Sequence, residues 1–387
     1  MTTINRQNQR IIFIGPPLAN ESTKSKEGIA AFELTKKDDS SVTLRQTKVA
    51  TNAQTNSHIA LTNNGQLLLA VTESSSMAES RIHAWRLVDD NGKELESPHW
   101  LGSWPIGGTG ACQIVVHRND RFIYVANYGN GSVTAFKDAA KRGDLVRCNT
   151  FKFDGDMVAE GRNLIPRITS VILTPNDSYV YLTDAGSNCV WKTNYSILSG
   201  FEFITELPQP FAAPEGSGPG RGVVATRDDG MFVYIGCQSS NHLLVYWIDE
   251  EEFGALEQTQ YVPVMPQDKS SDQEQAAEGL GVTDIELSKD ERFLYIATHK
   301  HNAISVFAID QEGKANFIHW VESGGCGLRS LLLVSDLDML IVANQKSKDL
   351  TAYMIEKESG RLCERLNINN SKKLELEYEP TSLQILQ

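Results

Sequence analysis

CQIVVHRNDRFIYVANYGNGSVTAF, residues 112–136, contains three consecutive β-strand patterns and decides how the chain folds. The first pattern runs from Gln113 to His117, the second from Phe122 to Ala126 and the third from Ser132 to Phe136. A polar turn separates the first two, and a glycine turn at residues 128–131 separates the last two. Strand-forming runs bounded by Asn, Asp and Gly predict antiparallel hairpins. One such meander cannot bury both of its faces, so it needs further copies to pack against.

Five other segments repeat this succession of strand, polar turn, aromatic or aliphatic strand and third strand. The six first strands start at His58, Gln113, Ser170, Gly222, Asp284 and Ser330. Successive starts are 46 to 62 residues apart, which suits a unit of four strands with its loops. A repeat of this length predicts an all-β ring of blades, which is a β-propeller.

The two ends of the chain each carry part of a seventh unit. Residues 10–15 (RIIFIG) match a second strand without a first, and residues 380–386 (PTSLQIL) match a first strand with nothing after it. Pairing the two closes the ring and removes exposed sheet edges. We therefore predict a seven-bladed β-propeller with four-stranded blades, a single domain over residues 10–387, preceded by a flexible segment at residues 1–9.

Composition and charge narrow the classes of function. The 387 residues are 41% hydrophobic and 22% charged, which is ordinary for a globular protein. A net charge of −13 disfavours nucleic acid and anionic membranes as partners, and no apolar run is long enough to span a bilayer. The apolar stretch near the N-terminus is too short for a signal peptide, and the six cysteines show no paired spacing. We therefore expect a cytoplasmic protein with reduced thiols, and no pattern indicates its oligomeric state.

Candidate site residues are expected where inner strands begin and second strands end, because both open on one mouth of the central channel. Polar and charged side chains at the inner-strand positions are His58, Gln113, Thr169, Arg221, Asp284, Glu286 and Arg329. Those at the ends of second strands are Glu73, Asp184, Gln238, His299 and Gln345. A purely structural channel would be apolar here, so we expect a small polar molecule to bind at this mouth. No clustered Cys, His and Asp spacing indicates a metal, and we expect no cofactor.

Segments along nearly the whole chain resemble the seven-bladed lactonase propellers, a family that includes bacterial 6-phosphogluconolactonase and fungal carboxy-cis,cis-muconate cyclase. The segments that show the resemblance are FIYVANYGNGSV (122–133), PRITSVILTPNDSYVYL (166–182), GVTDIELSKDERFLYIATHKHNAISVF (281–307) and LRSLLLVSDLDMLIVANQKSKDLTAY (328–353). The resemblance implies an enzyme that opens or forms a lactone or related oxygen ring on a small polar metabolite.

The same resemblance implies roles for four positions, and most of the family's residues are replaced there. The family typically has a histidine, an arginine, a glutamate and a second arginine where this chain has Thr169, Arg221, Gln238 and Glu286. One residue fewer in the preceding turn would put Cys237 at the glutamate position. Thr169 and Gln238 form hydrogen bonds but do not titrate near neutral pH, so they cannot act as a general acid or base.

Each candidate has a functional and a structural interpretation. Asp284 and Glu286 lie two apart in one strand and therefore on one face, where they can supply a base or neutralise an arginine. Arg221 can bind substrate or pair with either carboxylate, and His58 can replace the family histidine or serve the fold. We expect the catalytic residues to be Arg221, Asp284, Glu286 and Gln238. The expected substrate-binding residues are His58, Glu73, Gln113, Thr169, His299 and Arg329.

Three functions remain open at this stage. A lactone hydrolase would need a base to activate water, with Arg221 and Gln238 stabilising the oxyanion. A cyclase or isomerase acting on a secondary metabolite needs fewer titrating groups, because the substrate supplies its own nucleophile. A non-catalytic propeller that binds a ligand or protein is the third, since three of the four family residues are replaced.

Overall fold

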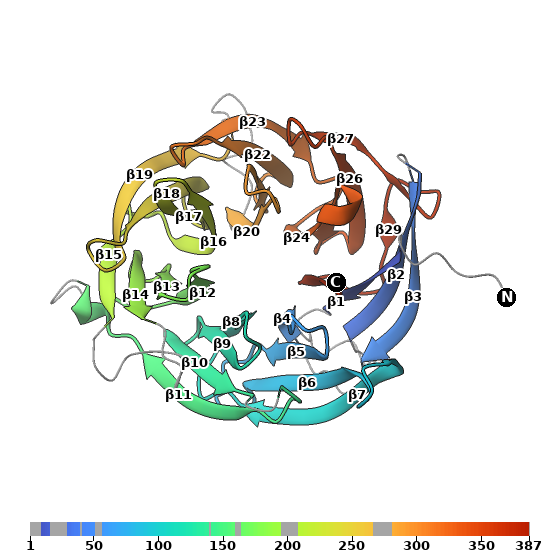
Figure 1. Cartoon of the computed structure of the whole chain (residues 1–387), viewed down its shortest axis with the longest axis horizontal. Helices are drawn as coiled ribbons and strands as arrows, with labels where there is room; N and C mark the ends of the chain where they lie inside the picture. Colours follow the sequence, from blue (N-terminus) through green and yellow to red (C-terminus); the bar gives the residue numbers. More distant parts are fainter. Residues whose placement is uncertain are drawn as a thin grey trace.

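Seven antiparallel sheets, the blades, stand around a central axis in the computed structural model (Figure 1). The structure describes residues 9–15, 29–38, 41–50, 56–138, 141–158, 164–194, 208–265 and 281–386. Within these ranges the helical structure consists of two 3-10 turns, η2 (Gly155–Met157) and η3 (Ser335–Leu337). The predicted seven-bladed β-propeller is confirmed. Residues 1–8 of the segment predicted to be flexible lie outside the described residues.

Each blade is a meander that runs from the axis to the rim. The inner strands are β30 (Leu383–Leu386), β4 (Asn56–Leu61), β8 (Ala111–Val116), β12 (Ile168–Leu173), β16 (Pro219–Arg227), β20 (Val282–Leu287) and β24 (Leu328–Val334). The second strands are β1 (Gln9–Ile14), β5 (Leu67–Thr72), β9 (Phe122–Asn127), β13 (Tyr179–Asp184), β17 (Gly230–Cys237), β21 (Phe293–Thr298) and β25 (Met339–Asn344).

The outer half of each blade completes the meander. The third strands are β2 (Ile29–Asp38), β6 (Arg81–Val88), β10 (Ser132–Lys137), β14 (Cys189–Asn194), β18 (His242–Asp249), β22 (Ala303–Ile309) and β26 (Asp349–Ile355). The outer strands are β3 (Ser41–Ala50), β7 (Glu94–Pro105), β11 (Val146–Lys152), β15 (Gln209–Ala212), β19 (Ala255–Pro263), β23 (Ala315–Glu322) and β27 (Leu362–Arg365). Two short strands, β28 (Asn367–Ile368) and β29 (Leu374–Glu375), follow.

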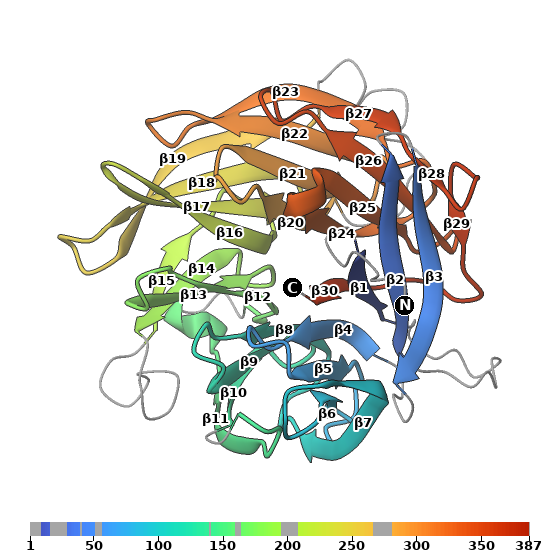
Figure 2. The same cartoon turned by 45° about the vertical axis from the view of Figure 1, so that its right-hand side comes forward.

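Strands from both ends of the chain close the ring, as predicted. In one sheet the order is β28-β3-β2-β1-β30, so the last strand pairs with the first (Figure 2). The antiparallel register places Phe13 opposite Gln384, and Gly15 N–H donates to Ser382 O at 2.9 Å. The chain also passes outside this sheet, where the Asn369 side chain accepts from Leu44 N–H and donates to Leu44 O. The carboxyl-terminal segment therefore supplies the inner strand of this blade, β30, and also pairs with its outer strand, β3.

The apolar core is divided into seven clusters, one between each pair of neighbouring blades. The second strands supply its centre, and every residue of β5, β9, β21 and β25 is buried. Strands covered on both faces are apolar without alternation, which is why their sequences are unbroken runs such as FIYVAN and MLIVAN. A blade therefore gains its stability from its neighbours and cannot fold alone.

Tyrosines at one position of the second strand link successive blades by the same hydrogen bond. The hydroxyl of Tyr181 donates to Gly254 O at 2.8 Å, that of Tyr234 to Gly313 O at 2.7 Å, and that of Tyr295 to Gly360 O at 3.0 Å. Each acceptor lies in the turn between the third and outer strands of the next blade, where the glycine has positive φ. Tyrosines at equivalent positions of the repeat thus form the same hydrogen bond to the neighbouring blade.

Replacing Tyr234 with Phe should lower the free energy of unfolding by about 1–2 kcal/mol, because the buried Gly313 carbonyl loses its hydroxyl donor. Chemical denaturation monitored by fluorescence measures the loss. The matched control is Tyr128→Phe, which removes a hydroxyl from an exposed ring and should change stability by less than about 0.5 kcal/mol. Equal effects from the two substitutions would contradict the prediction.

Candidate functional site

A β-bulge interrupts the beginning of six of the seven inner strands. The register shifts between Asn56 and His58 in β4, and the same irregularity occurs at the start of β8, β12, β16, β20 and β24. A bulge leaves a residue unpaired, bends the strand and redirects a side chain. The residues skipped by the pairing are Ser57, Cys112, Thr169, Gly220 with Arg221, Thr283 and Arg329.

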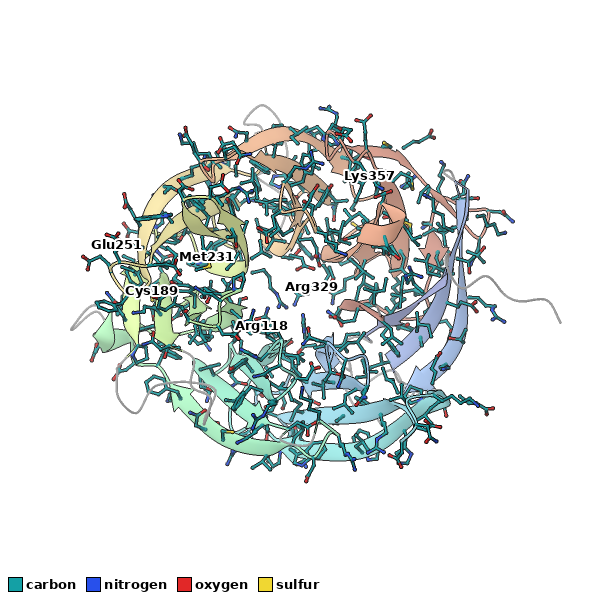
Figure 3. The ribbon with its side chains drawn as sticks, in the orientation of Figure 1. Arg118, Cys189, Met231, Glu251, Arg329 and Lys357 are labelled. Atoms are coloured by element: carbon teal, nitrogen blue, oxygen red, sulfur yellow. The ribbon has the colours of Figure 1, made fainter. Side chains whose placement is uncertain are left out.

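All of these bulge residues line one pocket at the centre of the ring. Thr381, which precedes β30 in the seventh blade, lines it too. The cavity has a volume of about 280 Å³, just below the roughly 300–1,000 Å³ typical of ligand pockets. Figure 3 shows Arg329 near the centre of the ring. The repeated bulge therefore builds much of the wall of a pocket sized for a small metabolite, and all seven blades contribute to its lining.

In three blades the residue after the bulge, and in the seventh blade Ser382, connects its blade to the next one. His58 Nδ1 accepts a hydrogen bond from Ile114 N–H at 3.4 Å, and Gln113 Oε1 accepts one from Val171 N–H at 2.7 Å. In the same way, an Asp284 carboxylate oxygen accepts from Leu331 N–H at 2.9 Å. Ser382 Oγ accepts from Ile59 N–H at 3.4 Å. These N–H groups lie on the unpaired edge of an inner strand and have no partner in their own sheet. The side chains of the preceding blade therefore accept their hydrogen bonds.

His58 is held as a neutral imidazole. Because Nδ1 accepts from a backbone N–H, the ring proton lies on Nε2. Burial lowers the pKa of His58 well below 6.5, and the nearby positive charges of Arg221 and Arg329 lower it further. His58 lines the pocket and therefore presents a hydrogen-bond donor rather than a positive charge.

Two guanidinium groups supply the positive charge of the pocket. Arg221 is half-buried, and its Nη2 donates to Cys112 O at 3.1 Å. Burial lowers the pKa of Arg221, whereas Asp284 raises it. Arg329 is half-buried as well, and no hydrogen bond or ion pair joins its guanidinium to any residue that the structure describes. Arg221 is thus anchored by the protein, while Arg329 is available to a ligand.

Two carboxylates line the pocket in different environments. Asp284 accepts three hydrogen bonds, from Leu331 N–H, Ser330 Oγ and Ile285 N–H. Burial raises the pKa of Asp284, although Arg221 and these hydrogen bonds oppose the shift. Glu73 follows the second strand β5, and it forms no hydrogen bond with any described residue. Burial raises the pKa of Glu73 above its usual 4.5, opposed by Arg329.

Seven of the ten predicted site residues line the pocket. They are His58, Glu73, Thr169, Arg221, Gln238, Asp284 and Arg329. The other three, Gln113, Glu286 and His299, do not line it. Gln113 is occupied by its contact with the next blade, and burial next to Asp284 raises the pKa of Glu286 well above 4.5. Burial, together with Lys346 and Arg329, lowers the pKa of His299.

Sequence reasoning missed several lining residues. These are Ser57, Cys112, Tyr128, Gly220, Val282, Thr283, Ser330 and Thr381. Three of them, Ser57, Cys112 and Thr283, stand immediately before a predicted first-strand start. A rule that took the residue before each start would have found them, but a bulge has no pattern of its own in these sequences. Burial raises the pKa of the Cys112 thiol to about 11, so this lining residue remains a neutral thiol.

The family model described as "Lactonase, 7-bladed beta-propeller" matches residues 17–371. The chain belongs to this lactonase family. It is 25% identical over 337 residues to the 6-phosphogluconolactonase of Bacillus subtilis, which covers 87% of this chain and 89% of that protein. It is also 25% identical over 356 residues to an uncharacterized protein of Staphylococcus aureus, covering 91% and 96% of the two chains.

Solved structures show the same fold at lower identity. The periplasmic gluconolactonase of Pseudomonas aeruginosa superposes with a TM-score of 0.78 at 20% identity, covering 98% of this chain and 99% of that one. A protein from Lactobacillus plantarum gives 0.78 at 23% identity, covering 98% and 100%. These likenesses support the seven-bladed architecture of a lactonase-family chain.

The described residues contain no group of three or more His, Cys, Asp and Glu side chains able to hold a metal ion. No helix in the same ranges has the length and hydropathy of a membrane span.

Replacing His58 with Gln should make the protein less sensitive to acid. The folded-state pKa of His58 lies below 6.5, so the folded protein binds fewer protons than the unfolded chain. The contribution of His58 to stability is therefore complete above pH 6.5 and declines as the pH falls toward the folded pKa. In that interval the free energy of unfolding of His58→Gln should fall by up to about 1.4 kcal/mol less per pH unit than that of the wild type.

The substitution keeps an acceptor for Ile114 N–H, since Gln113 makes the equivalent contact in the next blade. Denaturation midpoints between about pH 7 and pH 5 give the two slopes. His99→Gln, at an exposed position of β7, is the control and should leave the slope as it is in the wild type. A steeper slope in His58→Gln would contradict the neutral, hydrogen-bonded state of His58.

Proposed function

We propose that this protein hydrolyses the lactone ring of a small polar metabolite in the central pocket. Membership of the lactonase family supports this reaction class. The observation that carries the proposal is the pairing, in one pocket, of an unengaged carboxylate of raised pKa, Glu73, with two guanidinium groups, Arg221 and Arg329. A base for water and cations for an oxyanion are the two requirements of ester hydrolysis.

Glu73 is the general base in this proposal. Its raised pKa makes it a better proton acceptor than an exposed glutamate, and no described residue occupies its oxygens. Asp284 is less suited, because three hydrogen bonds commit its carboxylate to the contact between blades. Glu73 stands at the end of a second strand, as Gln238 does three blades further on. The resemblance places the family's glutamate at Gln238, so the carboxylate here enters the pocket from a different blade.

Arg221 and Arg329 stabilise the charge that develops on the carbonyl oxygen. Both residues are half-buried, and a charge–charge interaction there is stronger than in bulk water. Arg221 is oriented by its hydrogen bond to Cys112 O, and Arg329 is free to follow the substrate. His58, with its proton on Nε2, and the Gln238 amide offer further neutral donors.

The reaction has two steps with one proton passing through Glu73. Water attacks the lactone carbonyl while Glu73 takes a proton from it, and a new C–O bond forms as the carbonyl oxygen becomes an oxyanion. The intermediate then collapses, the ring C–O bond breaks, and protonated Glu73 returns its proton to the leaving ring oxygen. The product is the open hydroxy acid. Ring closure by the reverse of these steps would make the same site lactonising.

Glu73→Gln should reduce kcat for lactone opening by about 10²- to 10⁴-fold with little change in KM, because the amide cannot accept the proton of water. In the wild type, kcat should fall as the pH drops through a pKa above 4.5, where Glu73 becomes protonated. Acid release from a panel of γ- and δ-lactones, with and without an anionic group, measures both effects.

Glu79→Gln is the matched control, because Glu79 is an exposed glutamate in the loop that follows Glu73. It should leave kcat and its pH profile unchanged. Full activity of Glu73→Gln would exclude Glu73 as the base. Binding of lactones by the wild type without any acid release would instead favour a non-catalytic propeller.

Arg329→Met should lower kcat/KM by about 10²- to 10³-fold through loss of oxyanion stabilisation. The thermal midpoint should change little, because the Arg329 guanidinium has no hydrogen bond to a described residue. Arg142→Met, an exposed position outside the pocket, is the control for removing one positive charge. A large loss of stability with unchanged kcat/KM would show that Arg329 serves the fold instead.

A further inference from the structure

An aromatic ring stands in the wall of this polar pocket. Tyr128 follows the second strand β9 and lines the cavity, and the residue is 39% exposed. Most tyrosines at the centre of the blades are buried and use their hydroxyls to reach neighbouring strands or turns. Tyr128 lies in the turn after the second strand and places its ring at the pocket and at solvent, where an apolar surface has a cost in water. A ligand that packs on the ring would explain why the ring is exposed at the pocket.

The loop that carries Tyr128 is tightly fixed. Tyr128 N–H donates to Gly110 O at 2.9 Å, and Gly129 N–H donates to Thr109 O at 2.8 Å. The two segments approach so closely that a Cβ on Gly110 would lie 2.6 Å from Gly129 N, and one on Gly129 would lie 2.7 Å from Thr109 O. Glycine at both positions permits this approach. The ring is therefore presented on a rigid loop rather than on a mobile one.

Arg167 holds the ring from one side. Its guanidinium lies 5.4 Å from the centroid of the Tyr128 ring, within the range of a cation–π contact. The same guanidinium donates to Gly129 O at 2.6 Å, and Arg167 N–H donates to the buried Asp184 carboxylate at 2.6 Å. Both ends of Arg167 are thus anchored, and the contact restricts the rotamers of Tyr128. A preorganised aromatic ring costs little entropy when a ligand packs on it.

We propose that Tyr128 is a specificity-determining residue, whose ring packs against the ring of the bound lactone. This role rests on the proposed function. Apart from Val282, the other large side chains that line the pocket are charged or polar, so Tyr128 supplies the main apolar surface for the C–H face of a cyclic substrate. Ring opening turns that face into a flexible chain. Tyr128 therefore favours the cyclic substrate over the open hydroxy acid, which assists release of the product.

Binding and turnover together test this role. The probes are γ-butyrolactam, δ-valerolactam and gluconolactam, whose rings resist opening, and the open acid gluconate. Calorimetric titration should show that Tyr128→Ala loses about fivefold to tenfold in affinity for the lactam that binds the wild type most tightly. Gluconate affinity should stay unchanged. Tyr128→Phe, which keeps the ring, should retain lactam binding.

The control is Phe253→Ala, which removes an exposed aromatic ring outside the pocket and should affect neither ligand. Thermal melting of each variant confirms that it is folded. Equal lactam affinity in the wild type and Tyr128→Ala, or equal losses for lactam and gluconate, would overturn the role of Tyr128 while leaving lactone hydrolysis intact. If the wild type neither binds a lactam nor opens any lactone of the panel, the proposed function fails and this role fails with it.

Discussion

The inner strand of every blade is a sheet edge, and its outward N–H groups have no partner within their own blade. His58, Gln113 and Asp284 each accept a hydrogen bond from such an N–H group in the next blade. The bulge that precedes each of these residues turns the neighbouring side chain toward the axis. The same local distortion thus joins the blades and forms the pocket.

Residues at and after the bulge both take part in the two tasks. The bulge residues line the pocket, and three of them, Ser57, Thr169 and Thr283, also donate hydrogen bonds to the next blade. After the bulge, His58 and Asp284 line the pocket and also accept hydrogen bonds from the next blade. Arg221 and Arg329 occupy bulge positions and carry the chemistry in our proposal. Asp284 and His58 occupy the following position, so substituting them disturbs the ring as well as the pocket. Activity lost on changing Asp284 would therefore not by itself identify a base.

In a propeller the equivalent strand ends of all blades converge on one axis. A side chain with a given role in the pocket can therefore come from any blade. The resemblance to the family points to a histidine and a glutamate at positions here held by Thr169 and Gln238. Glu73 and His58 come from another blade and line the same pocket. The pocket therefore contains a carboxylate and an imidazole, although Thr169 and Gln238 are uncharged. The rigid aromatic Tyr128 adds an apolar surface to this otherwise polar set.

The sequence by itself determined the number of blades, their strands and the closure by the two termini, because turn chemistry and apolar runs are local properties that repeat along the chain. Strand starts and ends are also visible in the repeat, and seven of the ten residues chosen from them line the central pocket. Only the tertiary structure decided that Gln113 and Glu286 lie outside the pocket and that Cys112, Thr283 and Tyr128 line it. The direction of a side chain beside a bulge depends on pairing across strands and on contacts with the next blade, which no local pattern records.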